Sequence, residues 1–199
     1  MKKWFSIISI IIVSTTLHAQ AISVDHLIPN GLRQISATGI KVDISGCKYT
    51  FALNAAVGER GELWGLVVGS DYHMDENTEL LMRLDNDEII HLSADRVNAS
   101  TRTTPEHYTT YTFGGISETY VEPEEERAYF VSIFTLIDNQ VSLLEDHSIK
   151  KMRISLGQSY LEKASGLKKM SRWLSKSAMM IRERIQRPMK SPTSIMDGF

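Results

Sequence analysis

The sequence predicts an α+β domain in which a mainly antiparallel β-sheet of about eight strands is covered by a C-terminal amphipathic helix. Apolar and polar residues alternate along several segments between residues 47 and 156, as they do in half-buried strands. Turn-forming residues separate these segments. Between residues 167 and 187 apolar residues recur at intervals of three and four, which is the period of a helix. A β-sandwich with an appended helix is the alternative.

The first 21 residues have the organisation of a secretory signal peptide. Lys2 and Lys3 precede the apolar run 4–13, and Ala19-Gln20-Ala21 forms a small-x-small cleavage site. The apolar run is about half as long as the roughly 20 residues that a membrane-spanning helix needs. We therefore expect an exported chain that begins near Ile22 and works in the periplasm or outside the cell.

The remaining length predicts one globular α+β domain over residues 22–188 and a flexible tail over residues 189–199. Hydrophobic residues make up 42% and charged residues 23% of the chain, as in ordinary globular proteins. Cys47 is the only cysteine, so an internal disulfide is impossible. Because Cys47 does not follow the signal boundary, a lipid anchor is not expected.

The strongest strand signal follows a weak lead-in. Residues 22–46 contain several turn formers and predict only one short strand, near Ile40–Ile44. From residue 47 onward the alternation is regular, and it places the following residues on one buried face: Cys47, Tyr49, Phe51, Leu53 and Ala55. After a turn at residues 58–61, the return strand 63–68 places Trp64, Leu66 and Val68 on a common face.

A second hairpin follows an acidic loop over residues 71–79. A three-residue turn at residues 85–87 puts all the apolar side chains of this hairpin on one face, whereas a two-residue turn does not. We therefore expect the longer turn. The five side chains are Leu80, Met82, Leu84, Ile90 and Leu92.

The second half of the chain continues the β pattern before the final helix. Residues 94–107 are polar and predict a long loop, and residues 108–113 and 116–121 predict two strands separated by a turn or bulge at two glycines. The apolar run 128–137 predicts a central strand. Asp138 is a candidate cap for a short helix that carries Val141 and Leu144 inward. Strands are expected at 150–156 and 160–163, and the helix at 167–187 ends before Pro188.

Charge is distributed unevenly along the chain. Residues 22–166 contain 12 lysines and arginines against 22 acidic residues, whereas residues 167–190 contain eight basic residues and one acidic residue. The terminal helix is therefore either a cover for the sheet with a solvated basic side, or a surface that contacts an acidic partner or an anionic membrane. The candidate interaction residues are Lys168, Lys169, Arg172, Lys176 and Arg182.

The acidic loop 71–79 is the best metal candidate, because carboxylates and His73 are suitable ligands for Ca²⁺ or Zn²⁺. The spacing of a calcium loop is absent, however, and no second histidine lies at helical spacing. His73 and Met74 are soft enough for copper, but a copper site needs further converging ligands. A solvated loop explains these residues better, and we expect neither a metal nor an organic cofactor.

Other reactive residues do not form a catalytic motif. The remaining histidines of the expected mature chain are scattered, without a nucleophile elbow, a zinc-protease motif or a phosphate-binding loop. Cys47 lies on the apolar side of its strand and is expected to be buried. The acidic run at residues 122–126 is expected to be a solvated turn, with a docking surface for a basic partner as the alternative.

One part of the pattern resembles a known group of proteins. The hairpin Glu79–Ile90, together with residues 149–154 and the basic terminal helix, is similar to small exported proteins of gut-type Gram-negative bacteria that have no assigned activity. The resemblance covers about half of the chain, implies an envelope location and transfers no catalytic residue. Asn86-Asp87 stands where an Asn-Gly turn is expected, which leaves the turn type open.

Together these features favour an exported cell-envelope protein that is a non-enzymatic binding or interaction module for a protein or ligand of the envelope. Two alternatives stay open. One is a small periplasmic hydrolase whose site is assembled from scattered residues, and the other is a membrane-surface protein held by the basic helix. Nucleic acid is not an expected partner, because the rest of the chain is acidic and the predicted location is outside the cytoplasm.

Overall fold

The computed structural model describes residues 21–28, 31–59, 61–104, 107–113, 116–122 and 125–187. For residues 104, 107–113 and 116–122 only the course of the backbone is described. The expected signal peptide and the expected tail at residues 189–199 therefore lie outside the described residues.

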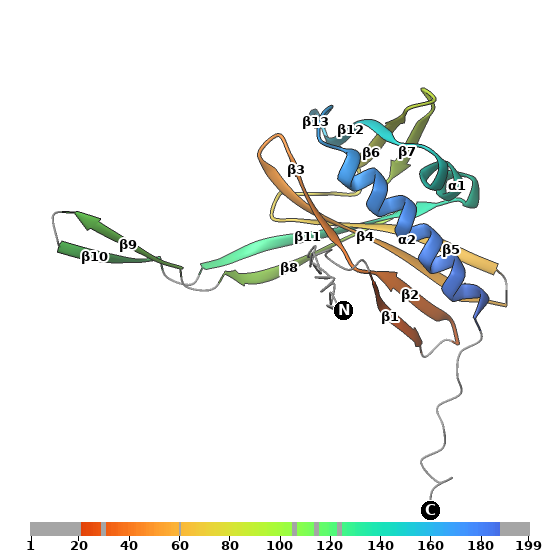
Figure 1. Cartoon of the computed structure of the whole chain (residues 1–199), viewed down its shortest axis with the longest axis horizontal. Helices are drawn as coiled ribbons and strands as arrows, with labels where there is room; N and C mark the ends of the chain where they lie inside the picture. Colours follow the sequence, from red (N-terminus) through yellow and green to blue (C-terminus); the bar gives the residue numbers. More distant parts are fainter. Residues whose placement is uncertain are drawn as a thin grey trace, which may run out of the picture.

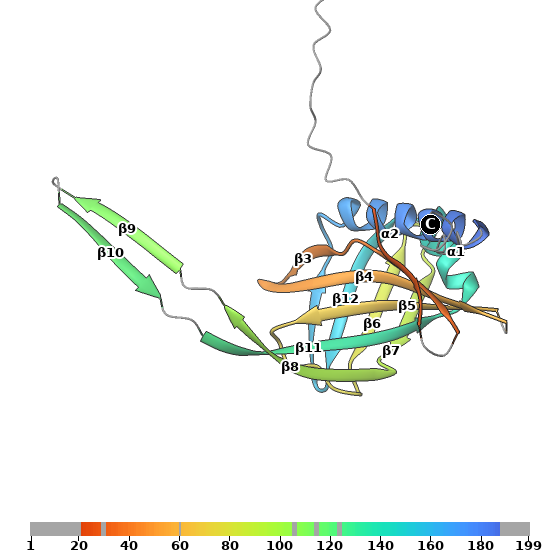
Figure 2. The ribbon, with the colours of Figure 1, turned by 90° about the horizontal axis from the view of Figure 1, so that it is seen from below.

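The predicted α+β class is confirmed: within the described ranges the chain forms antiparallel sheets and two helices. The strands number 13 there, and they divide into seven-, four- and two-stranded sheets rather than one sheet of about eight. Strands of the four-stranded sheet cross those of the seven-stranded sheet at a steep angle (Figure 2). The protein therefore has a two-sheet core, and a helix covers one side of it.

The seven-stranded sheet has the order β1-β2-β4-β5-β11-β8, and β3 also pairs with β4. All of its neighbouring strands are antiparallel. Its strands are β1 (Ile22–Leu27), β2 (Arg33–Ala37), β3 (Ile40–Ile44), β4 (Cys47–Gly58), β5 (Gly61–Ser70), β8 (Arg96–Thr104) and β11 (Glu125–Leu136).

The four-stranded sheet has the order β13-β12-β6-β7. Its strands are β6 (Glu79–Leu84), β7 (Ile89–Ser93), β12 (Ile149–Leu156) and β13 (Ser159–Lys163). The helices are α1 (Asp138–Asp146) and α2 (Lys168–Gln186). Helix α2 packs against α1, β2 and β4 and runs along one side of the domain (Figure 1).

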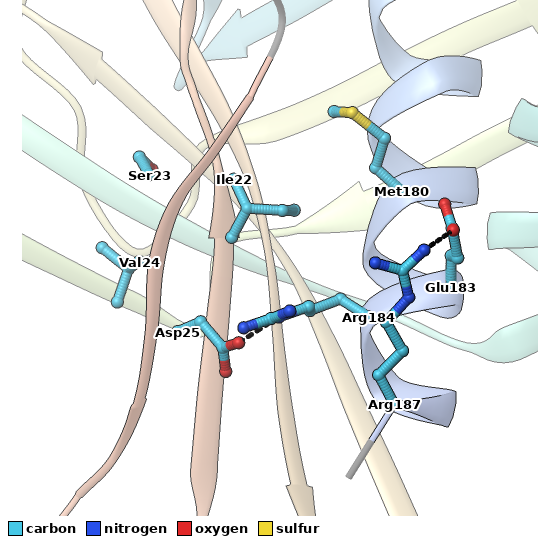
Figure 3. Close-up of a pocket in the computed structure, with 8 residues that line it drawn as sticks. All are labelled: Ile22, Ser23, Val24, Asp25, Met180, Glu183, Arg184 and Arg187. Atoms are coloured by element: carbon cyan, nitrogen blue, oxygen red, sulfur yellow. Dashed lines mark hydrogen bonds and ion pairs between the residues drawn. The ribbon is translucent and has the colours of Figure 1, made fainter. Parts of the chain in front are cut away.

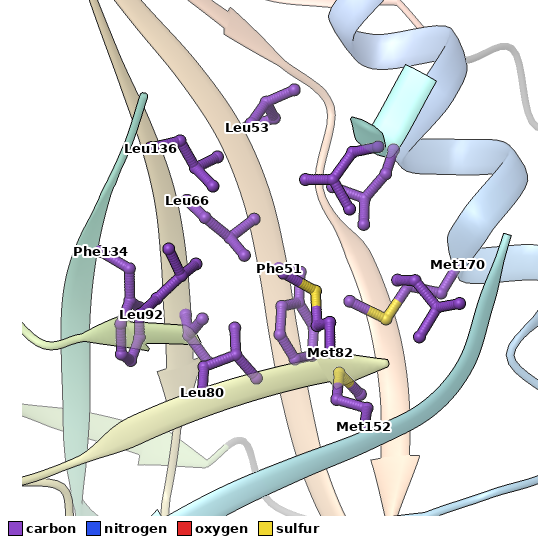
Figure 4. Close-up of a cluster of buried hydrophobic side chains, with 14 of the residues drawn as sticks. Phe51, Leu53, Leu66, Leu80, Met82, Leu92, Phe134, Leu136, Met152 and Met170 are labelled. Carbon is purple, nitrogen blue, oxygen red and sulfur yellow. The ribbon is translucent and has the colours of Figure 1, made fainter. Parts of the chain in front are cut away.

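The core lies where the inner faces of the two main sheets and α2 meet (Figure 4). Every residue that the alternation placed on the inner faces of the two predicted hairpins is buried. Phe51, Leu66 and Phe134 from the larger sheet lie close to Leu80 and Met82 from the smaller sheet (Figure 4). Burying a side chain of this size stabilises the fold by about 1.5–3 kcal/mol, so the contact between the two sheets contributes substantially to the packing energy.

The predicted three-residue turn of the β6–β7 hairpin is confirmed. Leu84 N–H donates to Glu88 O at 2.8 Å, and Asp87 N–H donates to Leu84 O at 3.1 Å, which leaves three residues in the loop. Asp87 has a φ of 69°, in the left-handed region. Aspartate tolerates this region better than most residues with a Cβ, which explains why it occupies a position expected to hold glycine.

Replacement of Asp87 tests this backbone requirement. Asp87→Ala is expected to lower the melting temperature by about 2–4 °C relative to Asp87→Asn, because alanine tolerates the left-handed conformation less well. Both variants remove the negative charge that forms exposed ion pairs with Arg83 and Lys150, so their difference reports the backbone conformation together with any exposed hydrogen bond that the asparagine Oδ1 still accepts. Thermal unfolding followed by circular dichroism measures it, and equal melting temperatures would contradict the assignment.

Two predictions for loop regions were wrong. Residues 22–46 contain β1 and β2 in addition to the expected β3, and the expected loop 94–107 contains β8. Strand β2 lies between β1 and β4 and beneath α2, so that four of its five residues are buried although its sequence is mainly polar. Strand β8 is a mostly exposed edge strand. Neither strand has the one-sided burial that produces an alternating pattern.

The expected short helix exists as α1, and Val141 and Leu144 face the core as predicted. Its N-cap is Ile137 rather than Asp138. The Ile137 N–H donates to Gln140 Oε1 at 3.1 Å, which satisfies one donor at the start of the helix. The Asp138 carboxylate is instead free to meet α2, where it pairs with Arg182.

A two-stranded arm extends away from the rest of the domain (Figure 1). Strand β5 pairs with β11 only as far as Phe130, so beyond that point β8 and β11 continue as an isolated pair. Strands β9 (His107–Phe113) and β10 (Ile116–Glu122), both predicted, extend this pair. We use the term arm for β9, β10 and the strand ends Ser100–Thr104 and Glu125–Tyr129.

Candidate functional site

Helix α2 carries the basic residues that the sequence singled out, and its opposite side anchors it to the core. Met170, Leu174 and Ala178 are fully buried. Trp173 is also buried, and its indole Nε1 donates to Thr38 O at 2.8 Å. Ser171 Oγ accepts the Ile149 N–H at 2.9 Å, which links the helix to β12. These contacts fix the orientation of α2 about its own axis, so that the same side always faces the core.

The C-terminal end of α2 is held by an ion cluster. The Asp25 carboxylate accepts hydrogen bonds from Arg33, at 2.7 and 3.0 Å, and from Arg184 of α2. The hydrogen bonds from Arg33 above all, and then those from Arg184, lower the pKa of Asp25 to about 2 despite its burial. Arg33 also donates to Arg187 O at 2.8 Å and so satisfies a terminal carbonyl of the helix.

This cluster borders a hollow of about 370 Å³ between β1 and α2 (Figure 3). Figure 3 shows Arg184 reaching from α2 across to Asp25, while Arg187 turns toward Glu183 on the helix itself. The charged groups that line this hollow are thus already paired with one another. We therefore interpret the hollow as a by-product of the contacts that anchor α2, and not as a ligand site.

The outward side of α2 presents four cations. They are exposed, and none forms an ion pair with any residue that the structure describes. Spacings of four residues place Lys168, Arg172 and Lys176 along one stripe of the helix, and Lys169 lies beside it. We call this surface the basic face; it consists of Lys168, Lys169, Arg172 and Lys176.

Arg182, the fifth predicted interaction residue, does not belong to the basic face. Its Nε donates to Glu145 Oε1 at 2.8 Å, and its Nη2 donates to Asp138 Oδ1 at 2.7 Å. Its guanidinium also lies 5.3 Å from the centre of the Trp64 ring. Arg182 therefore joins α2 to α1, and its charge is compensated within the domain.

A hollow of about 230 Å³ lies beside the basic face, between the end of α1 and the beginning of α2. His147 lines it, and the His147 Nδ1 lies 2.9 Å from Asp85 Oδ1. Hydrolysis needs a nucleophile within reach of such a histidine. The two α2 hydroxyls of this hollow are bound elsewhere, because Ser171 Oγ donates to Leu167 O and Ser175 Oγ donates to Glu145 O. The third hydroxyl, that of Ser148, belongs to a residue whose backbone is bonded to Asp85: Ser148 N–H donates to Asp85 Oδ2 at 3.1 Å, and Asp85 N–H donates to Ser148 O at 2.9 Å. The contact between His147 and Asp85 is thus one of several bonds that join the end of α1 to the β6–β7 turn.

The acidic loop 71–79 does not assemble a metal site. No group of three potential metal ligands occurs in the described parts of the chain. Met74 is buried and accepts the Ser132 hydroxyl at 3.5 Å, whereas the ring of His73 packs edge-on against Phe130 at 4.9 Å. Asp75 Oδ1 accepts the Asn77 N–H at 2.9 Å. These side chains shape the connection between the two main sheets.

The remaining candidates have structural surroundings. Cys47 is buried on the inner side of β4, as predicted. His91 lies 3.2 Å from Glu79 on the exposed side of the smaller sheet. In the acidic run, Glu125 and Glu126 begin β11 and are exposed, while the turn residues before them lie outside the described residues. Sequence reasoning missed the Asp25–Arg33–Arg184 cluster, because Asp25 and Arg33 meet only through the pairing of β1 with β2, which was not predicted, and Arg184 lies 159 residues from Asp25 along the chain.

Helices long and apolar enough to cross a membrane are not found in the described part of the chain. Comparisons with protein-family models, with curated proteins and with solved structures find no match to this chain.

Proposed function

We propose that this protein is an exported, non-enzymatic interaction module of the cell envelope, and that the basic face of α2 docks an acidic partner. The observation that carries the proposal is the contrast between two groups of cations on one helix. Arg182, Arg184 and Arg187 are paired with carboxylates of the domain. The four cations of the basic face have no such partner among the described residues.

Unpaired cations on a rigid surface favour binding of an acidic partner in two ways. They create a local positive potential that speeds the encounter with a negatively charged surface. They also lose no existing ion pair when the partner binds. The burial of Met170, Trp173 and Leu174 holds α2 in place, so little ordering of the helix is needed on binding.

The membrane alternative has weaker support. A basic helix that lies in a membrane interface inserts its apolar side among the lipids. In α2 that side includes Leu174, Ala178 and Ile181, which are buried in the core. A contact of this helix with a membrane is therefore electrostatic, with only the exposed Met179 as an apolar addition.

Crosslinking in living cells tests the proposal. The test variant combines Lys168→Glu, Arg172→Glu and Lys176→Glu. The matched control combines Lys41→Glu, Lys48→Glu and Arg96→Glu, which make the same change of charge at exposed positions elsewhere. We expect an envelope protein to be crosslinked to the native chain and the control, and its yield to fall about tenfold or more in the test variant.

Circular dichroism first confirms that each variant is folded. Equal crosslinking of the test variant and the native chain would overturn the proposal. Flotation with vesicles of anionic or neutral phospholipid separates the membrane alternative. Binding to anionic vesicles that is lost at high salt, without a crosslinked protein, would replace the acidic protein partner by a membrane surface.

A further inference from the structure

We propose that the acidic partner is a second copy of this chain, and that the arm of each copy docks on the basic face of the other. This inference rests on the proposed function, because it names the partner of the same surface. Among the described elements, β9 and β10 pack substantially only against each other, and the cations of the basic face have no ion-pair partner among the described residues. The arm also points away from α2 of its own copy, so it cannot reach that helix (Figure 1).

The charges of the two surfaces are complementary. The described residues of the arm include four glutamates and two arginines. Arg127 is paired with Glu125, and the guanidinium of Arg102 lies 5.7 Å from the centre of the Tyr129 ring. Four glutamates against two arginines give the described residues of the arm an excess of two negative charges, and Glu118, Glu122 and Glu126 are the positions that contribute to it besides the Glu125–Arg127 pair. The basic face opposes them with four cations.

The spacing of the charges also agrees. Glu118 and Glu122 stand opposite Tyr111 and His107 in the register, and their even separation puts both positions on one face of β10. Four residues of a strand span about 13 Å. Lys168 and Lys176 lie on one stripe of α2, and eight residues of a helix span about 12 Å. The two rows of charge thus match in length.

The direction of the arm is compatible with a reciprocal contact. Figure 2 shows β9 and β10 displaced from the ends of β8 and β11 in the direction in which α2 lies. If two copies are related by a two-fold axis beside the arm, each arm extends over the α2 side of the other copy. Such an arrangement is closed and uses the same two surfaces twice, as most homodimers do.

Docking also explains how the arm is stabilised. A two-stranded hairpin by itself is only marginally stable in water. Strands β9 and β10 have seven residues each, which corresponds to a length of about 20 Å. If the hairpin packs along this length against α2 of a second copy, it gains the contact with a helix that a two-stranded hairpin needs for stability.

Sedimentation of the chain purified after export, at low and at high salt, tests the dimer. We expect a dimer at low salt that dissociates as salt rises. The arm variant combines Glu118→Lys with Glu122→Lys, and the helix variant combines Lys168→Glu with Lys176→Glu. Each places like charges against each other, so we expect dimerisation to weaken about a hundredfold or more. The control, Lys41→Glu with Lys48→Glu, should remain dimeric.

A mixture of the two monomeric variants provides the decisive measurement. In a heterodimer, the lysines on the arm of the arm variant face the glutamates on α2 of the helix variant. At the second interface, the native arm of the helix variant faces the native α2 of the arm variant. Opposite charges meet at both interfaces, so a heterodimer should form. Misfolded variants would not recover in this way. The inference is overturned if the native chain is monomeric at low salt, if either reversed variant stays dimeric, or if the mixture stays monomeric. A monomeric chain that still loses its crosslinked partner in the basic-face variant refutes the dimer and retains the proposed function.

Discussion

Trp173→Ala is expected to lower the free energy of unfolding by about 3–5 kcal/mol, the largest effect of any single change on α2. The indole is buried between the helix and the larger sheet, so its removal leaves a cavity and exposes apolar neighbours. It also removes the hydrogen bond from Nε1 to Thr38 O. Urea unfolding followed by circular dichroism measures the loss.

Two further variants separate the contributions of Trp173. Trp173→Phe keeps most of the packing and removes the hydrogen bond, so we expect a loss of about 1–2 kcal/mol. Met179→Ala alters the exposed side of the same helix and should change the stability by less than about 0.5 kcal/mol. If Trp173→Ala were as stable as Met179→Ala, α2 would not be packed as described.

Asp25→Asn is expected to lower the free energy of unfolding at neutral pH by about 2–3 kcal/mol. The carboxylate is nearly buried between two guanidinium groups, and the neutral amide leaves both cations without their counter-charge. The matched control is Glu183→Gln, which removes an exposed carboxylate that pairs with Arg187 at the same end of α2. An exposed pair of this kind contributes about 0.5 kcal/mol or less.

The pH dependence gives an independent test of the same cluster. The pKa of Asp25 is about 2 in the folded protein, compared with an ordinary value of 3.8. A lowered folded pKa means that the carboxylate stabilises the fold fully above about pH 4 and loses this contribution as the pH falls toward 2. A difference of nearly two units corresponds to about 2.5 kcal/mol.

We therefore expect the stability difference between the native chain and Asp25→Asn to be constant from pH 7 to about 5 and to shrink steadily below pH 4. Urea unfolding at a series of pH values measures this difference. Other carboxylates titrate in both proteins, so their contribution cancels. A difference that does not change between pH 5 and 2 would show that Asp25 is not held in its charged form by Arg33 and Arg184.

The helix and the inner faces of the main hairpins were predictable, because each buries one side against a core and exposes the other. Phe51, Leu66 and Leu80 occupy the positions that the alternation indicated. Strands β2 and β8 were missed for opposite reasons, since one is almost wholly buried and the other almost wholly exposed. A strand without contrast between its two faces leaves no periodic signal.

The candidate site shows a similar limit. A helical period places Arg182 only about 40° from Lys168 around the helix axis, so sequence assigns both to one surface. In the structure, α1 lies beside the second half of α2 and offers Glu145 and Asp138 to Arg182. The first half of the outward side has no acidic neighbour within ion-pair distance among the described residues, so Lys168 and Arg172 stay unpaired.

The sequence by itself determined the fold class, the period and boundaries of the C-terminal helix, the three-residue turn and the concentration of positive charge near the C-terminus. These properties depend on neighbours within a few residues along the chain. The tertiary structure alone decided the division into two main sheets, the isolation of the arm, the cluster around Asp25 and the pairing of Arg182. Each of these depends on contacts between segments that are distant in sequence, which a local periodicity does not record.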